Sequence, residues 1–161
     1  MSATKYCFVD IDGVLRHKTF FKEHRDELTN DHLDGMYLFD PVSMGNLNRI
    51  VEETGCEIVV SSSWRLSMEP SDLVNVFRFN DFKGTIAGIT PIYLGSYDHS
   101  VPRGKEIDGW LSQHKCESYC IIDDCNNMLK HQNPNLVIVD DNIGLTESDA
   151  DMAIHILTAT C

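Results

Sequence analysis

The sequence has no long hydrophobic run, and we expect no secretory leader. No apolar stretch approaches the ~18 residues that a membrane-spanning helix needs. The first residues, Met1 to Lys5, lack a charged region followed by a long apolar stretch, which is the pattern of a signal peptide. We therefore expect a cytoplasmic protein with no membrane partner.

Paired metal-binding cysteines are also missing. The six cysteines form no Cys-x-x-Cys pair, and the seven histidines show no metal-ligand spacing. A structural zinc site is therefore not expected, because such sites draw their ligands from these short spacings. Cys7, Cys56 and Cys120 lie in or beside apolar runs, so we expect them to be reduced core residues. The histidines are expected on the surface or in loops.

Basic residues are few. The chain has 13 Lys and Arg against 25 Asp and Glu, and its formal net charge is -12 at pH 7. Such a field repels nucleic acid and anionic membranes at long range, which argues against a general nucleic-acid-coating role. A nucleotide or a nucleic-acid end is still compatible with this charge, because a few local cations and a metal can reverse the potential in one cleft.

Repeats, low-complexity tracts and linkers are absent as well, and the 161 residues fit one domain over 1–161. Short apolar runs alternate with amphipathic segments. The apolar runs predict buried strands over 6–11, 57–60, 119–122 and 136–139. Helical spacing predicts helices over 42–54, 71–79, 103–114 and 146–157, with Gly55 as a helix stop. This alternation predicts the α/β class, with a parallel sheet that has helices on both faces.

The ends of three predicted strands carry reactive side chains. Asp-Ile-Asp-Gly follows the first strand at 10–13, Ser-Ser-Ser-Trp-Arg follows the second at 61–65, and Asp123 and Asp124 follow the third. Arg103-Gly104-Lys105 opens a helix between the second and third. Ligands of open parallel sheets bind beyond the carboxyl ends of the strands, so we expect these groups to converge at one edge.

These residue types suit phosphoryl transfer. Crowded carboxylates raise one another's pKa unless a cation neutralises them, and Mg²⁺ suits a few carboxylates together with phosphate and water. One Asp can attack phosphorus, while a second can protonate the leaving oxygen and later activate water. A hydroxyl and a cationic side chain can hold the phosphoryl oxygens. The pattern predicts a magnesium-dependent phosphomonoesterase with an aspartyl-phosphate intermediate.

The ordered set resembles the haloacid dehalogenase (HAD) superfamily of phosphohydrolases, and the resemblance implies a three-layer Rossmann-like fold. Four segments are also similar to the HAD domains of RNA-repair (Swiss Army Knife) proteins and, more distantly, to polynucleotide kinase phosphatase domains. They are Ser61–Arg65, Thr90-Pro91, Arg103–Leu111 and Gly144–Thr146. The resemblance covers nearly the whole chain.

The resemblance implies a role for each matching residue. Asp10 would be the nucleophile, and Asp12 the general acid and base. Asp10, the backbone carbonyl of Asp12, Asp123 and Asp124 would hold Mg²⁺ directly or through water. Gly13 would allow the sharp turn after the strand.

Other roles stay open between neighbouring residues. Ser61 would bind the phosphoryl group, with Ser62 as the competing choice. Lys105 has the usual residue type for the catalytic cation, but Arg103 could serve instead. Arg65 matches an arginine that contacts substrate phosphate in polynucleotide phosphatases.

Some acidic and aromatic residues receive no functional role at this point. Asp140-Asp141 also follows an apolar strand, and we interpret the pair as a solvated turn. Trp64 and Trp110 are expected to pack in the protein instead of stacking on a base.

HAD enzymes often carry a cap domain, and the two insertion points here span 16–40 and 66–102. Both are short for a folded domain of ~50 or more residues, so we expect a minimal cap or none, and an open site. An open site suits a nucleic-acid 3'-phosphate end. The alternatives are a phosphatase of small nucleotides or sugar phosphates, and a non-catalytic binding module that keeps the fold.

Overall fold

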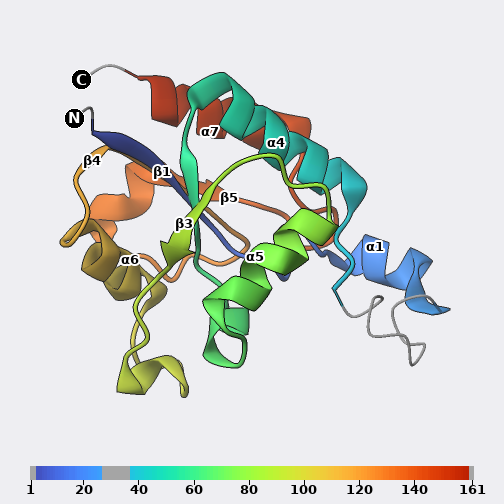
Figure 1. Cartoon of the computed structure of the whole chain (residues 1–161), viewed down its shortest axis with the longest axis horizontal. Helices are drawn as coiled ribbons and strands as arrows, with labels where there is room; N and C mark the ends of the chain where they lie inside the picture. The colour runs from blue at the N-terminus through green and yellow to red at the C-terminus, as the bar shows by residue number, and fades with distance from the viewer. Residues whose placement is uncertain (1–2, 27–36, 160–161) are drawn as a thin grey trace.

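A parallel sheet with helices on both faces forms the centre of the computed structural model, which describes residues 3–26 and 37–159 (Figure 1). The strands are β1 (Thr4–Val9), β2 (Glu57–Val60), β3 (Ile86–Ile89), β4 (Cys116–Asp123) and β5 (Leu136–Ile138). They lie in the order β3-β2-β1-β4-β5, and every pair is parallel. The order therefore reverses between β1 and β4, which is where a sheet of this kind offers a ligand site.

The central strand β1 is covered on both faces, which explains the apolar sequence of its buried part, from Tyr6 to Val9. Cys7 and Val9 belong to the larger core cluster, whereas Tyr6 and Phe8 belong to the smaller cluster on the opposite face. Cys7, Cys56 and Cys120 are buried free thiols, as the sequence predicted.

Helices form the outer layers. They are α1 (Lys18–Glu23), α4 (Pro41–Thr54), α5 (Pro70–Phe79), α6 (Arg103–Leu111) and α7 (Glu147–Thr158), together with the 3₁₀ turns η1 (Ser63–Leu66), η2 (Leu94–Ser96) and η3 (Lys130–Asn135). Side chains of α4, α5 and α7 build the larger cluster, and α6 contributes Ile107 and Trp110 to the smaller one. The α/β fold with helices on both faces is confirmed. No helix among the described residues is long and apolar enough to cross a bilayer.

Local sequence signals set the helix ends. Asp40 caps α4 by accepting hydrogen bonds from the Val42 and Ser43 N–H groups, and Gly55 ends this helix in the left-handed conformation that glycine adopts easily. Thr146 caps α7. His17 caps α1 and is hydrogen-bonded to the cap residue Asp40, at 2.9 Å, so its imidazole is buried within the loop before α1.

The structure differs from the sequence prediction mainly between residues 66 and 102. This segment contains α5, which the sequence predicted, and also η2 and the edge strand β3, which it did not predict. It therefore forms no separate cap domain. The helix predicted over 71–79 begins at Pro70 after Glu69, and the helix predicted to reach residue 114 ends at Leu111. The other insertion point includes residues 27–36, which lie outside the described residues, so its openness stays a prediction.

Candidate active site

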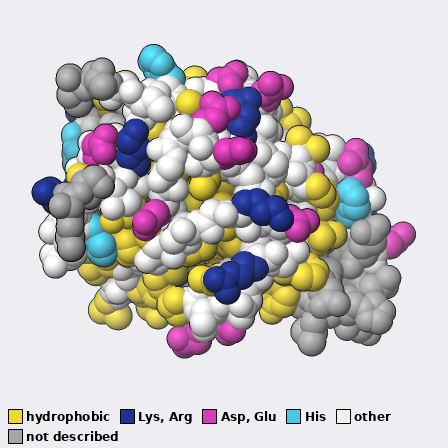
Figure 2. Space-filling view, turned by 45° about the horizontal axis from the view of Figure 1, so that its top comes forward, with side chains coloured by type: hydrophobic (Ala, Val, Ile, Leu, Met, Phe, Trp, Pro, Cys, Tyr) yellow, Lys and Arg dark blue, Asp and Glu magenta, His cyan; other side chains and the backbone are white. Residues whose placement is uncertain are grey.

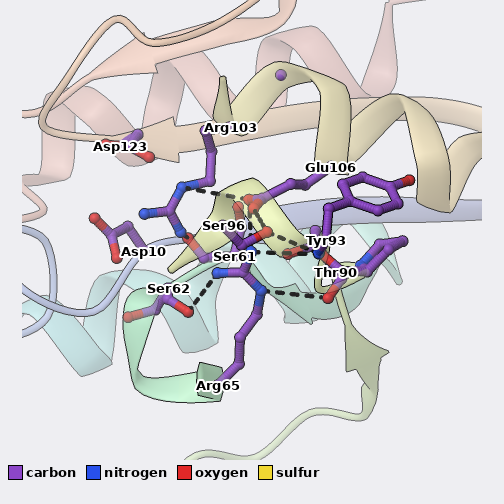
Figure 3. A network of polar contacts seen from close by, with 12 residues as sticks. Asp10, Ser61, Ser62, Arg65, Thr90, Tyr93, Ser96, Arg103, Glu106 and Asp123 are labelled. Carbon is purple, nitrogen blue, oxygen red and sulfur yellow. Dashed lines mark hydrogen bonds and ion pairs between the residues drawn. The ribbon is translucent and has the colours of Figure 1, made fainter. Parts of the chain in front are cut away.

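Side chains from β1, β2, β4 and α6 meet at the carboxyl edge of the sheet (Figure 3). Asp10 follows β1, and its N–H donates to the Ile122 carbonyl at 3.0 Å. Ser61 follows β2, and its N–H donates to the Val9 carbonyl at 2.9 Å. These backbone bonds extend the strand register by one residue and hold Asp10 between the neighbouring strand ends.

Asp10 is a buried carboxyl, with only 9% of its surface exposed. Its Oδ1 accepts a hydrogen bond from the Ile11 N–H at 2.8 Å. Burial raises its pKa to about 6, although Arg103, the Ile11 N–H and the Ser62 hydroxyl all lower it. With this pKa, the Asp10 carboxyl is ionised in most molecules at neutral pH, as a nucleophile must be.

Asp123, at the end of β4, is a second buried carboxyl beside Asp10. Burial, and then the charge of Asp10, raises the pKa of Asp123 to about 8, against the lowering effects of the Cys125 N–H and Arg103. Ligand atoms of Asp123, Asp124 and Cys125 all lie within 4.8 Å of one another. The buried carboxylates of Asp10 and Asp123, together with the neighbouring Asp124, repel one another unless a cation neutralises them.

Magnesium fits this set of donors better than a softer metal. The carboxylates of Asp10, Asp123 and Asp124 are hard oxygen donors of the kind that Mg²⁺ prefers, whereas the Cys125 thiol would favour a soft ion. Cys125 is also exposed, and burial together with the Asp124 and Asp123 charges raises the pKa of its thiol, which disfavours the thiolate that binds metals.

The raised pKa values predict how magnesium changes stability with pH. Without metal, the folded protein holds protons on Asp10 and Asp123 that the unfolded chain has released, so the free energy of unfolding falls as pH rises from about 4 to about 8. Magnesium relieves the repulsion, and its melting-temperature gain over EDTA should be larger at pH 8 than at pH 5. Thermal melts of wild type and Asp123→Asn test this. An equal magnesium effect at both pH values in the wild type would contradict it.

Asp12 and Gly13 follow Asp10 in the chain and, together with Asp124, line an open cleft of about 850 Å³. Asp12 is exposed, and its Oδ2 accepts a hydrogen bond from Trp64 Nε1 at 2.8 Å. Gly13 has a φ of +84°, and a Cβ there would lie 2.5 Å from Asp124 Oδ2. The glycine therefore permits both the turn and the close approach of a carboxylate proposed to bind metal.

Ser61 and Ser62 are both buried, but their hydroxyls have different surroundings. The Ser62 hydroxyl lies near the Asp10 carboxyl and lowers its pKa, and it caps η1 by accepting a hydrogen bond from the Trp64 N–H. The buried Ser61 hydroxyl has no hydrogen-bond partner among the described residues, while the Ser61 carbonyl accepts from Arg103. Of the two serines that the sequence left open, the geometry therefore favours Ser62 as the contact for a phosphoryl group on Asp10.

Arg103, and not Lys105, is the cation beside the carboxylates. The Arg103 side chain extends from the start of α6 toward Asp10 and donates to the Ser61 carbonyl (Figure 3). Its charge lowers the pKa of both Asp10 and Asp123. Lys105 is exposed to solvent. The geometry therefore favours Arg103 over the usual residue type, because side chains two positions apart on a helix point in different directions. Which of the two is the catalytic cation stays a prediction.

Arg65, which the sequence predicted to contact substrate phosphate, lies in a buried ion pair in the structure. Only 3% of its surface is exposed, and its Nη2 lies 2.6 Å from Glu106 Oε2. Its Nη1 also donates to the Ser62 carbonyl at 2.8 Å. Glu106 accepts from the Ser96 hydroxyl at 2.6 Å and lies 3.9 Å from Arg103 Nε. This Arg65–Glu106 pair connects η1 and α6, and Glu106 in turn holds the Arg103 side chain in position.

The Arg65–Glu106 pair should contribute strongly to stability. Arg65→Met leaves the Glu106 carboxylate buried with fewer partners, which should cost about 3 kcal/mol of unfolding free energy. Arg49→Met is the matched control, because Arg49 pairs with acids that are at least half exposed, and it should cost less than about 1 kcal/mol. Urea unfolding of both variants measures the difference. Equal losses would show that Arg65 is not a structural residue.

Two residues near the site were not expected from the sequence. Glu106 gave no signal beyond its place in the Arg-Gly-Lys-Glu-Ile segment, because its partners come from distant parts of the chain. Asp141, which was interpreted as part of a solvated turn, lines the cleft and pairs with Lys18 at 2.6 Å. Trp64 both packs against the core and faces the cleft, whereas Trp110 packs in the smaller cluster.

Comparison with known proteins gives one match. The family described as the HAD domain in Swiss Army Knife RNA repair proteins matches residues 6–150, from within β1 to the first turn of α7. No curated protein and no solved structure matches the chain. The matched range reaches every strand and includes each of the site residues described above.

Proposed function

Because the chain belongs to the family of HAD domains in Swiss Army Knife RNA repair proteins, we propose that it is a magnesium-dependent phosphomonoesterase that acts through Asp10. Membership of this family indicates a phosphohydrolase of the HAD type. The observation that supports the mechanism is the surroundings of Asp10: this buried carboxyl lies near a cation, Arg103, and near the paired acids Asp123 and Asp124, whose charges act on it or are affected by it.

In the proposed reaction, an Asp10 oxygen attacks the substrate phosphorus and forms an aspartyl-phosphate as the ester P–O bond breaks. The Asp12 carboxyl donates its proton to the leaving oxygen, which departs as an alcohol. Asp12 then takes a proton from water, whose oxygen attacks the phosphorus and releases inorganic phosphate and Asp10. Arg103 and Ser62 hold the phosphoryl oxygens in both steps. A bound Mg²⁺, held by Asp10, the Asp12 carbonyl, Asp123 and Asp124, supplies positive charge that keeps these carboxylates ionised together.

We propose a nucleic-acid 3'-phosphate end as the substrate. The family description and the absence of a cap in residues 66–102 support it. On the face shown in Figure 2, Lys and Arg side chains are few, and several of them lie beside acidic ones. An enzyme with a net charge of -12 would thus engage the end of a strand, and not a long stretch of its backbone.

A small-nucleotide phosphatase is the second candidate. The acidic charge and the size of the cleft, about 850 Å³, favour a substrate with few phosphates. The two candidates differ in how the rate depends on strand length. A terminal-phosphate enzyme should hydrolyse a 3'-phosphorylated oligonucleotide with a higher kcat/KM than the corresponding nucleoside 3'-monophosphate, and a small-nucleotide enzyme should show the reverse.

The test is phosphate release from an aryl phosphate, a nucleoside 3'-monophosphate and a 3'-phosphorylated oligonucleotide, each with Mg²⁺ or with EDTA. We expect turnover only with Mg²⁺. Turnover that EDTA leaves unchanged would exclude the proposed metal dependence. No turnover of any substrate, together with no heat of Mg²⁺ binding in calorimetry, would identify the chain as a non-catalytic binding module.

A further inference from the structure

The cleft beside Asp12 has two chemically different parts. One part of the lining consists of the catalytic residues and their neighbours, Asp12, Gly13 and Asp124. The other part consists of large apolar side chains, namely Phe21, Tyr37, Trp64 and Met68. The proposed function uses only the first part. The second part can bind the organic group to which the substrate's phosphate is attached.

Arg16, Phe21 and Trp64 form an aromatic–guanidinium cluster in the apolar part. The Arg16 guanidinium carbon lies 5.4 Å from the centroid of the Phe21 ring and 5.8 Å from that of Trp64. Burial lowers the pKa of Arg16, and the Asp12 charge opposes this, so the guanidinium lies partly out of water near the general acid. Planar cations and aromatic rings are the groups on which unstacked bases lie in proteins.

Trp64 connects this cluster to the reaction centre and is held rigidly. Its Nε1 donates to Asp12 Oδ2, so a group that contacts the indole lies one side chain away from the general acid. The Phe39 and Tyr37 rings meet the indole edge to face, at 5.8 and 6.2 Å between ring centroids. A side chain fixed in this way binds a flat ligand with little loss of conformational freedom.

We propose that this apolar part is a nucleobase subsite, in which the base next to the scissile phosphate stacks on the Arg16, Phe21 and Trp64 cluster. The inference rests on the proposed function, because it places the phosphate at Asp10. A base suits this cleft better than a plain aryl group, since Ser63 and Ser67 also line it and their hydroxyls can bond to base edges. Stacking also needs no positive net charge, which this acidic chain lacks.

Fluorescence titration tests stacking without catalysis. Asp10→Asn protein is titrated with a nucleoside 3'-monophosphate, with ribose phosphate lacking a base, and with a 3'-phosphorylated dinucleotide. We expect both base-containing ligands to quench the tryptophan emission and ribose phosphate not to. The quenching should persist with Trp110→Phe, whose indole packs in the smaller cluster, and disappear with Trp64→Phe. Quenching that Trp64→Phe leaves intact would overturn the proposal.

A pair of phenylalanine variants tests the subsite without altering Trp64. Phe21 is 41% exposed in the cleft, and Phe79 is 54% exposed outside it. Phe21→Leu should weaken binding of the nucleoside 3'-monophosphate about tenfold relative to Phe79→Leu, in line with the loss of one stacking contact. Equal affinities of the two variants would overturn the proposal.

The outcomes separate this inference from the proposed function. Base-dependent quenching by a protein that hydrolyses no phosphate ester would retain the subsite and reject the phosphatase. Magnesium-dependent hydrolysis with the same kcat/KM for nucleoside and ribose phosphates would retain the phosphatase and reject the subsite. A dinucleotide that binds more tightly than the mononucleotide would identify a strand end as the source of the base.

Discussion

Asp10→Asn is expected to lower kcat/KM for a magnesium-supported aryl phosphate hydrolysis by about 10⁴-fold or more, the scale on which enzymes lose rate with their nucleophile. The amide has nearly the same shape as the carboxyl, but it cannot form the aspartyl-phosphate. Asp140→Asn is the matched control, because Asp140 is an exposed acid bonded to Asn142. It should keep the wild-type rate to within about twofold.

The melting temperature of Asp10→Asn gives a second check on the role of Asp10. The uncharged amide in Asp10→Asn removes one of the buried carboxylates that repel each other, and the charge of Asp10 raises the pKa of Asp123. Asp10→Asn should therefore melt at a higher temperature than wild type in EDTA at pH 8. Inactivity with a lowered melting temperature would point to misfolding, and a retained rate would exclude Asp10 as the nucleophile.

The strands that build the site could be predicted from sequence because their signals are local. β1 and β2 end in apolar runs, and the side chains that follow them must lie at the same edge of a parallel sheet. Asp10, Ser62 and Asp123 therefore came together as expected. The edge strand β3 gave no comparable signal, since it is only half-buried and contains Gly88, which has weak strand preference.

Partners across the fold could not be predicted in the same way. Arg65 was expected to contact substrate because of its place after the serine-rich segment. In the structure Arg65 pairs with Glu106, which comes from the start of α6, and no local pattern indicates that the two side chains meet. Pairing of this kind depends on how α6 packs on the sheet, where Gly104 lies close to the Leu129 N–H group. Sequence periodicity fixes which residues share a helix face but not this approach.

The sequence left the choice between Arg103 and Lys105 open for the same reason, because it depends on how α6 packs. Both residues lie in the first turn of α6, and two positions along a helix turn a side chain through about 200°. The hydrogen bond from Arg103 to the Ser61 carbonyl and the ion pair with Glu106 turn Arg103 toward the carboxylates. Residue type alone favoured lysine, and packing decided for arginine.

Arg103→Gln is accordingly expected to lower kcat/KM about 10²- to 10³-fold, the scale of losing a group that stabilises charge in the transition state. Lys105→Gln is its matched control on the same helix, and it should change kcat/KM by less than about twofold. Steady-state hydrolysis of an aryl phosphate with Mg²⁺ measures both.

The pH dependence distinguishes a direct role of Arg103 from a merely structural one. Its charge lowers the pKa of Asp10, so the glutamine variant should need a higher pH to ionise the nucleophile. The acid limb of the kcat/KM profile should then move to higher pH in Arg103→Gln and stay in place in Lys105→Gln. If Lys105→Gln shows the larger loss and the shifted limb, then Lys105 is the catalytic cation, and the orientation of the first turn of α6 changes when substrate binds.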